Sequence, residues 1–196
     1  MNKYNEQDLL STISDCVRDH IQNKMHKRLS TLSDAIGVSH PTSSKILYPE
    51  KDNAGGVALK HWLSTLAHCD MLGTFMKEIE SKAKAWHFAL PPNDLNDPEE
   101  ALQRLTHLAN SFIKANHLNT NNLGCLLDVS HNTAKAMMFY GDSSGGVAIK
   151  SWLKLLNIME VNKDLENTFT KNLSNDYRNE KIAPRSFDLR AHQLVY

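Results

Sequence analysis

The sequence predicts an all-α protein built from two copies of one five-helix unit. Apolar residues recur at the three-to-four spacing of amphipathic helices, and no alternating apolar run has the length of a strand. Residues 32–47 and 123–138, which start 91 positions apart, share the pattern Val-Ser-His-x-Thr. A second block, Gly-Gly-Val-Ala followed by a lysine and by Trp-Leu, recurs at residues 55–63 and 145–153. This recurrence indicates that the chain uses one fold twice.

Each copy is expected to begin with one long amphipathic helix. In the first copy it covers residues 6–26, and the apolar residues on its buried face are Leu9, Leu10, Ile13, Cys16, Val17, Ile21 and Met25. In the second copy it covers residues 99–117, and the corresponding residues are Leu102, Leu105, Leu108, Phe112 and Ile113. Asp97 and Pro98 are expected as the cap and the first helical residue of this second helix.

Each of the two repeated stretches is expected to form two short helices joined by a tight turn. Gly37 and Asp128 stand where such a turn needs a positive φ, which glycine adopts freely and aspartate tolerates better than most residues. Ser39 and Ser130 follow and suit the N-cap of the second helix, because their hydroxyls can accept from its first free amides. The turn therefore ends where a new helix begins.

A small residue also follows the first leucine of each stretch, Ser33 in one copy and Gly124 in the other, where the second helix has to cross closely. Together with the turn residue and the capping serine, this spacing resembles the helix-turn-helix of lambda-repressor/Cro-like regulators, over roughly residues 5–80 and 98–172. In that family the second helix enters the major groove of DNA, and its N-terminal residues meet base edges.

The resemblance implies a sequence-specific transcriptional regulator whose partner is double-stranded DNA. Two motifs in one chain imply a covalent counterpart of the usual dimer, which would read two half-sites about one helical turn apart. A repressor of the kind common on phages and mobile elements is the expected type, by association with the family alone.

Loops and two further helices complete each copy. Residues 48–56 and 141–146, where glycine, serine, asparagine and proline gather, are expected as loops. A fourth helix is expected to open directly after each glycine pair, with Trp62 and Trp152 in its apolar stripe and therefore in the core. The apolar residues that indicate the fifth helices are Leu72, Phe75, Met76, Ile79, Leu165 and Phe169.

The predicted organisation is a first unit at residues 1–88, a linker at 89–97, a second unit at 98–172 and a C-terminal arm at 173–196. Two adjacent prolines in the linker forbid a continuous helix there. Each unit alone is small for a stable core, so the two are expected to pack together. The N-terminus lacks the apolar core of a signal peptide and no run reaches the length of a membrane span, so we expect a cytoplasmic protein with no membrane partner.

The residues expected to contact DNA lie at the starts of the second motif helices and of the fourth helices. They are His40, Thr42, Ser44, Lys45, Lys60, His131, Asn132, Thr133, Lys135 and Lys150. Asn132 can pair with two atoms of an adenine edge, the histidines can donate to guanine, and the lysines can reach guanine or phosphate. Lys60 and Lys150 are expected at phosphates. The residues expected to face inward are Ser43, Ile46, Leu47, Ala134, Met137 and Met138.

The charge balance opposes a strong nucleic-acid binder. With 22 basic and 22 acidic residues the net charge is zero, whereas affinity for nucleic acid rests largely on lysine and arginine. Between residues 24 and 60, however, basic residues outnumber acidic ones. A protein-binding adaptor or anti-activator that keeps the fold is therefore the alternative function. In a third possibility, one motif binds DNA and the other forms a homodimer.

Nothing in the sequence favours catalysis or a bound cofactor. It contains no nucleophile elbow, phosphate-binding loop or two-histidine helix motif. His61, His68 and Cys69 form the candidate metal cluster, but they lack metal-finger spacing and no metal is expected. Cys16, Cys69 and Cys125 are odd in number and lie in helical patterns, so we expect small buried side chains rather than disulfides.

Overall fold

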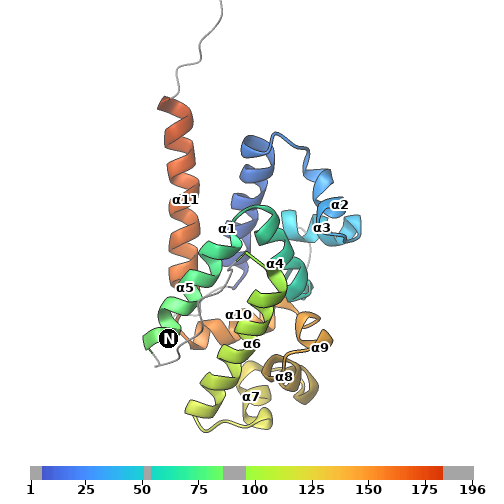
Figure 1. Ribbon diagram of the computed structural model, residues 1–196, viewed down its shortest axis with the longest axis vertical. Helices are drawn as coiled ribbons and strands as arrows, with labels where there is room; N and C mark the ends of the chain where they lie inside the picture. The colour runs from blue at the N-terminus through green and yellow to red at the C-terminus, as the bar shows by residue number, and fades with distance from the viewer. Residues whose placement is uncertain (1–5, 51–53, 86–95, 183–196) are drawn as a thin grey trace, which may run out of the picture.

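A computed structural model describes residues 6–50, 54–85 and 96–182, which form helices and no strand (Figure 1). The elements of the first half are α1 (Glu6–Asp19), a π-helical turn η1 (His20–Lys24), the 3-10 turn η2 (Leu29–Thr31), α2 (Leu32–Ala35), α3 (His40–Leu47), the 3-10 turn η3 (Ala54–Gly56), α4 (Leu59–His68) and α5 (Leu72–Ala85). Those of the second half are α6 (Pro98–Ala115), α7 (Thr120–Leu127), α8 (His131–Met138), α9 (Asp142–Gly145), α10 (Ile149–Ile158) and α11 (Asn162–Ile182). The prediction of an all-α protein is confirmed for these residues.

Several elements differ from the sequence prediction. The helix predicted over residues 6–26 is α-helical only in α1 and ends in the π-helical turn η1. Residues 141–146, expected as a loop, contain the short helix α9, where a serine hydroxyl bonds back to the glycine that precedes the helix. Helix α11 continues to Ile182, into the segment expected as an arm. Residues 183–196 and most of the 89–97 linker lie outside the described residues.

The start of α6 follows from its local sequence, whereas the starts of α4 and α10 do not. Asp97 caps α6, its carboxylate accepting from the Glu99 N–H at 2.9 Å, and Pro98 opens the helix as predicted. Helices α4 and α10 begin later than the glycine pairs suggest, because Ala58 and Ala148 are still extended. This short extended segment is used for a contact between the two halves.

The two halves meet through a symmetric backbone contact. The N–H of Leu59 donates to the carbonyl of Val147, and the N–H of Ile149 donates to the carbonyl of Val57, both at 2.9 Å. Ala58 and Ala148 therefore face each other in an isolated antiparallel bridge. Because matched residues of the two sequence repeats exchange the same bonds, the contact is isologous and a local two-fold axis passes between the alanines.

The last helix of each half packs against the first helix of the other half. Figure 1 shows α11 alongside α1 and α5 beside α6. The Cys16 thiol of α1 donates to the Phe169 carbonyl of α11 at 3.3 Å, and Arg104 of α6 donates to Glu80 of α5 at 2.6 Å. Helices α5 and α11 also touch each other, through a hydrogen bond from Thr168 to the Glu78 carboxylate. Each half thus contributes its last helix to the packing of the other half.

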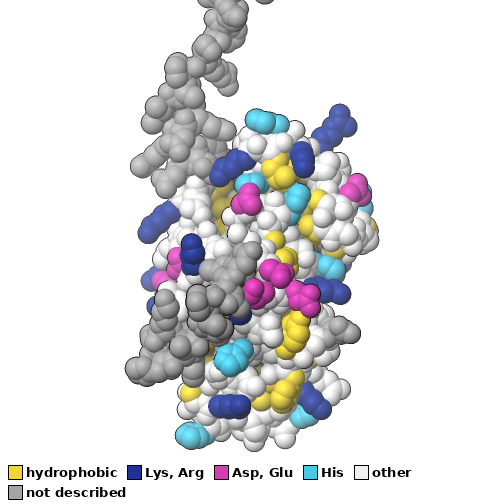
Figure 2. Space-filling view, viewed as in Figure 1, with side chains coloured by type: hydrophobic (Ala, Val, Ile, Leu, Met, Phe, Trp, Pro, Cys, Tyr) yellow, Lys and Arg dark blue, Asp and Glu magenta, His cyan; other side chains and the backbone are white. Residues whose placement is uncertain are grey.

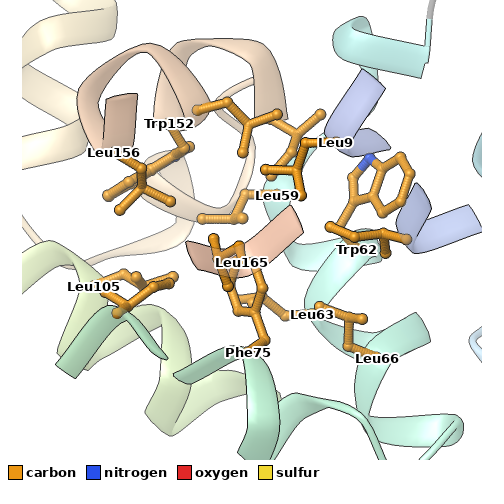
Figure 3. Packing of buried hydrophobic residues seen from close by; sticks show 14 of the residues in the cluster. Leu9, Leu59, Trp62, Leu63, Leu66, Phe75, Leu105, Trp152, Leu156 and Leu165 are labelled. Atoms are coloured by element: carbon orange, nitrogen blue, oxygen red, sulfur yellow. The ribbon is translucent and has the colours of Figure 1, made fainter. Parts of the chain in front are cut away.

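One hydrophobic core runs through both halves, as Figure 3 shows for side chains that include Trp62, Phe75 and Trp152. The two tryptophans are 2% and 1% exposed, so their predicted place in the core is confirmed. Each indole N–H is buried without an acceptor among the described residues, which is a further feature that the halves share. The expectation that the halves pack together is met by this common core.

The backbone turns of the two halves match one to one. Every residue with a positive φ in the described part of the chain belongs to a pair of equivalent positions, and the pairs are His26 and His117 (52° and 54°), Gly37 and Asp128 (65° and 52°), and Asp70 and Glu160 (54° and 58°). A positive φ is uncommon outside glycine, so three coincident pairs indicate the same backbone path in both halves.

The π-helical turn accommodates one extra residue in the first half. Leu10 and Leu102, both buried near the start of the first helix, lie 92 positions apart, whereas His26 and His117 lie 91 apart. The buried hydroxyls of Ser14 and Thr106 support this pairing, since each donates at 2.8 Å to the carbonyl four residues earlier. Inserting one residue into a helix commonly produces such a π-helical turn.

The first half has a cavity of about 280 Å³ beside this turn. Its lining includes Cys16, His20 and Cys69, whereas the second half has Leu108, Phe112 and Met159 at the equivalent positions. The smaller side chains of the first half leave space there, and burial raises the pKa of the Cys69 thiol to about 12. This thiol is therefore protonated and unreactive near neutral pH.

The ion pair of Arg104 and Glu80 should contribute much more to stability than the pair of Lys82 and Asp164. The side chain of Arg104 is 7% exposed, and that of Glu80 is 16% exposed, so Glu80→Ala leaves a buried charge with weaker compensation and should cost about 3 kcal/mol. Lys82→Ala removes an exposed pair at 2.9 Å and should cost far less. Urea denaturation measures both variants, and equal losses would contradict this assignment.

Stability should fall when the pH drops below the ordinary histidine pKa of 6.5. Burial is the main cause that lowers the pKa values of His20, His61 and His68, with nearby lysines adding to it. Below pH 6.5 the unfolded chain therefore binds protons before the folded protein does, which favours unfolding. Denaturant midpoints at about pH 7.5 and about pH 5.5 test this, and replacing His20 and His68 with glutamine should reduce the difference. A midpoint that rises on acidification would disprove it.

Candidate nucleic-acid interface

The turn in each repeated stretch has the predicted geometry. Gly37 and Asp128 lie in the left-handed region, and the hydroxyls of Ser39 and Ser130 accept from the amides of the residues three positions on, at 3.4 and 3.1 Å. In both copies the serine hydroxyl also lies 2.9 Å from a threonine hydroxyl, that of Thr42 or of Thr133. The two threonines therefore help to fix the start of α3 and α8.

The helix before the turn is better formed in the second half. Helix α7 begins with a reciprocal cap, in which Asn119 and Asn122 each accept from the other's backbone N–H, and Lys154 donates to the Leu127 carbonyl at its other end. A methyl group on Gly124 would lie 3.1 Å from the Val129 carbonyl, so the chain crosses here as closely as the sequence predicts. In the first half only the single turn of α2 follows the 3-10 turn η2.

Helices α3 and α8 bury the faces that their sequences indicate. The expected inward residues Ser43, Ile46, Leu47, Ala134 and Met137 are buried, and Met138 is half-buried against the core. The candidate contact residues that are exposed are His40, His131, Asn132, Lys135, Lys60 and Lys150. Those that are half-buried are Thr42, Ser44, Lys45 and Thr133. Each helix thus presents its first turn, led by a histidine, to solvent.

Three candidate residues of the second half line one open groove. Asn132 and Thr133 of α8 and Lys150 of α10 border a space of about 470 Å³, together with the hydroxyl-bearing Ser130 and Ser143. The groove runs from the start of α8 to the start of α10. An amide, several hydroxyls and an ammonium are donors suited to base edges and phosphate oxygens.

Lys60 has different surroundings from its counterpart Lys150. It borders a hollow of about 520 Å³ with Glu99 and Tyr140, whose hydroxyl donates to the Glu99 carboxylate at 2.7 Å. A methyl group on Gly145 would lie 3.2 Å from the Lys60 Cβ, so this lysine lies against α9 of the other half. Figure 2 shows a group of acidic side chains over the start of α6. A phosphate role is therefore less favourable for Lys60 than for Lys150.

Helices α3 and α8 belong to different halves of the molecule, and both can be followed in Figure 1. In Figure 1, α3 and α8 lie to the right of α5 and α11, one in the upper and one in the lower half of the view. They precede α4 and α10, the helices whose starts pair across the local axis between Ala58 and Ala148. A two-fold arrangement of two such helices is the geometry that a two-half-site duplex requires.

Several residues around these helices were not predicted from the sequence. Arg18 donates to the Leu47 carbonyl at 2.6 Å, where α3 ends, and its guanidinium lies 5.2 Å from the Tyr48 ring centre. Phe139 directly follows α8 and is 54% exposed, and Leu126 on α7 is 50% exposed. The adjacent aromatic residues Phe139 and Tyr140 could have indicated an exposed apolar surface after α8. The contact of Arg18 with Leu47 could not have been predicted, because the two residues are far apart in the sequence and share no pattern.

Two other expectations concern cysteine and metal binding. Cys16 and Cys69 are buried free thiols as expected, but Cys125 is exposed, because it lies on the outer face of α7 beside Leu126. Within the described ranges no three His, Cys, Asp or Glu side chains are placed to hold a metal ion. None of the helices in the described ranges is long and apolar enough to cross a membrane.

The chain matches no protein-family profile, no curated protein and no solved structure.

The two turns should respond oppositely to substitution. Gly37→Ala places a Cβ at a φ of 65°, where nothing lies within 4 Å, so backbone strain alone should cost about 1 kcal/mol. Asp128→Gly relieves the same strain at the matching turn and should leave stability unchanged or raise it by up to about 1 kcal/mol. Thermal unfolding of the two variants measures this, and a stabilised Gly37→Ala would contradict the left-handed turn.

Proposed function

We propose that the protein is a sequence-specific DNA-binding transcriptional regulator, of the repressor type, whose halves are two lambda-repressor-like helix-turn-helix units. The observation that carries this proposal is the pair of serine-capped, exposed helix starts of α3 and α8, in two halves that meet at the Ala58–Ala148 bridge. A fold of this kind needs its first helical turn free for base edges, and both helices leave it free.

The exposed side chains have the chemistry for direct readout. His40 and His131 can donate to guanine, Asn132 can bond to two atoms of an adenine edge, and Lys135 can reach guanine or phosphate. Lys150 borders the same groove as Asn132, so it can hold a phosphate while Asn132 meets a base. The helix N-termini add amide donors and a favourable dipole for phosphate.

The zero net charge limits how strongly such a protein can bind DNA. Each lysine or arginine at a phosphate releases about one counterion, so few contacts give modest affinity and a shallow salt dependence. In the proposed complex, specificity therefore depends on base contacts more than on charge. We expect specific binding that is measurable at low salt and that weakens moderately as salt is added.

A protein-binding adaptor is the second candidate, and exposed apolar side chains favour it. Leu126, Phe139 and Tyr140 are each about half exposed in the second half, close in sequence to the ends of α7 and α8. Exposed aromatic residues are enriched where proteins bind one another. A gel shift with sheared genomic DNA at low and moderate salt separates the two candidates, since an adaptor would shift no DNA at either salt.

Asn132→Ala should reduce both affinity and selectivity. Loss of a bidentate base contact costs about 1–3 kcal/mol and relaxes the preference at one base pair. Competition titrations with matched and single-mismatch duplexes measure this. Asn167→Ala, at an exposed position on α11, is the matched control and should bind like the parent.

Lys45→Ala should instead weaken binding to all sequences evenly. If its ammonium meets a phosphate, the variant loses one phosphate contact. The slope of log K against log salt should then become less steep by about 0.9. Titration at several salt concentrations measures the slope. If the Asn132 and Lys45 variants fold normally and bind as tightly and selectively as the parent, α3 and α8 do not enter the groove and the adaptor is the better proposal.

A further inference from the structure

We infer that one copy of this chain recognises an imperfect palindrome, a duplex with two unequal half-sites that is bound in one orientation. This inference rests on the proposed function and adds to it the stoichiometry, the symmetry of the DNA and the residues that distinguish the half-sites. It is carried by two observations: the two halves pair with each other within one chain, and the residues at corresponding positions of α3 and α8 differ.

The surfaces through which the two halves contact each other are buried within one molecule. The hydrogen bonds beside Ala58 and Ala148 pair the halves, and the last helix of each half covers the first helix of the other. Arg104 and Glu80 join one such pair of helices, and Cys16 bonds to the other. A second chain is therefore not needed to place a second reading helix, so one chain should occupy one operator.

Two of the candidate contact positions carry the same residue in both helices. His40 corresponds to His131 and Thr42 to Thr133, and each pair lies 91 positions apart with equivalent capping geometry. Histidines at corresponding positions of the two helices should make the same contact in each half-site. These base pairs form the symmetric part of the operator.

The remaining positions differ in what they can donate. Pro41 of α3 stands where α8 has Asn132, Ser44 stands where α8 has Lys135, and Lys45 stands where α8 has Ala136. Proline offers no hydrogen bond to an adenine edge, and the serine hydroxyl is shorter than the lysine side chain and uncharged. The half-site under α8 should therefore require an adenine where the half-site under α3 does not, and the lysines Lys45 and Lys135 should reach different positions in the two half-sites.

The flanking lysines increase this asymmetry. Lys150 borders the groove that also contains Asn132, whereas Lys60 lies in a hollow with Glu99 and against α9. A nearby carboxylate opposes the approach of a phosphate. The α8 half-site should therefore be the more tightly held of the two, and protection of its flanking phosphates should be stronger.

The first experiment selects duplexes from a random pool with the full chain and measures the mass of the complex. We expect an imperfect palindrome, one chain per duplex, and binding to each of the two perfect palindromes, made by doubling either half-site, that is about tenfold weaker or more. A perfect palindrome as the selected site, or two chains per operator, would overturn the inference while leaving the proposed function in place. Failure to enrich any duplex would overturn both.

The second experiment makes α3 resemble α8. The variant Pro41→Asn/Ser44→Lys should shift the preference from the imperfect palindrome to the doubled α8 half-site. The matched control Asn132→Ala/Lys135→Ser should lose the preference for the α8 half-site and keep that for the α3 half-site. Circular dichroism and the unfolding midpoint show that each variant is folded. If both folded variants keep the parent's preference, these positions do not distinguish the half-sites and the inference is wrong.

Discussion

The backbone pairing of Ala58 with Ala148 is the constraint on which the rest of the structure depends. Two hydrogen bonds of 2.9 Å join the extended segments that directly precede α4 and α10. These two helices therefore leave the axis in related directions. Each motif is attached to the start of one of these helices. The orientation of α3 relative to α8 is therefore set at the axis, by main-chain groups whose bonds depend little on the side chains.

The exchange of the last helices makes this arrangement stable. Helix α11 covers α1 and α5 covers α6, so each half completes its core with a helix of the other half, and the apolar residues form one cluster. A small unit buries a smaller fraction of its surface than a large domain does, and sharing helices increases the buried area of both halves. The proposed binding mode benefits from this, because two reading helices on one core stay in register with one duplex.

The two halves also differ in structure, and several of the differences lie at or near the candidate interface. The first half has a π-helical turn and a cavity where the second half is filled with larger apolar side chains. The second half has the fully capped helix α7, the groove with Asn132 and Lys150, and the exposed side chains Leu126 and Phe139. A chain with two fused copies can vary each copy separately, which a homodimer cannot do.

The sequence alone determined what depends on neighbouring residues. The helical class, the left-handed turns at Gly37 and Asp128 and the capping serines follow from local backbone and hydrogen-bond preferences, and the buried tryptophans follow from helical periodicity. The order of the candidate contact residues along α3 and α8 is likewise a property of the sequence. Whether they contact DNA depends on the proposed function.

Only the tertiary structure decided how the halves meet, that their last helices are exchanged, that Lys60 lies against α9, and that Cys125 is exposed. Each of these depends on residues far apart in the chain. Periodicity shows which face of a helix is apolar but not which helix covers it, because many partners bury the same area at similar free energy.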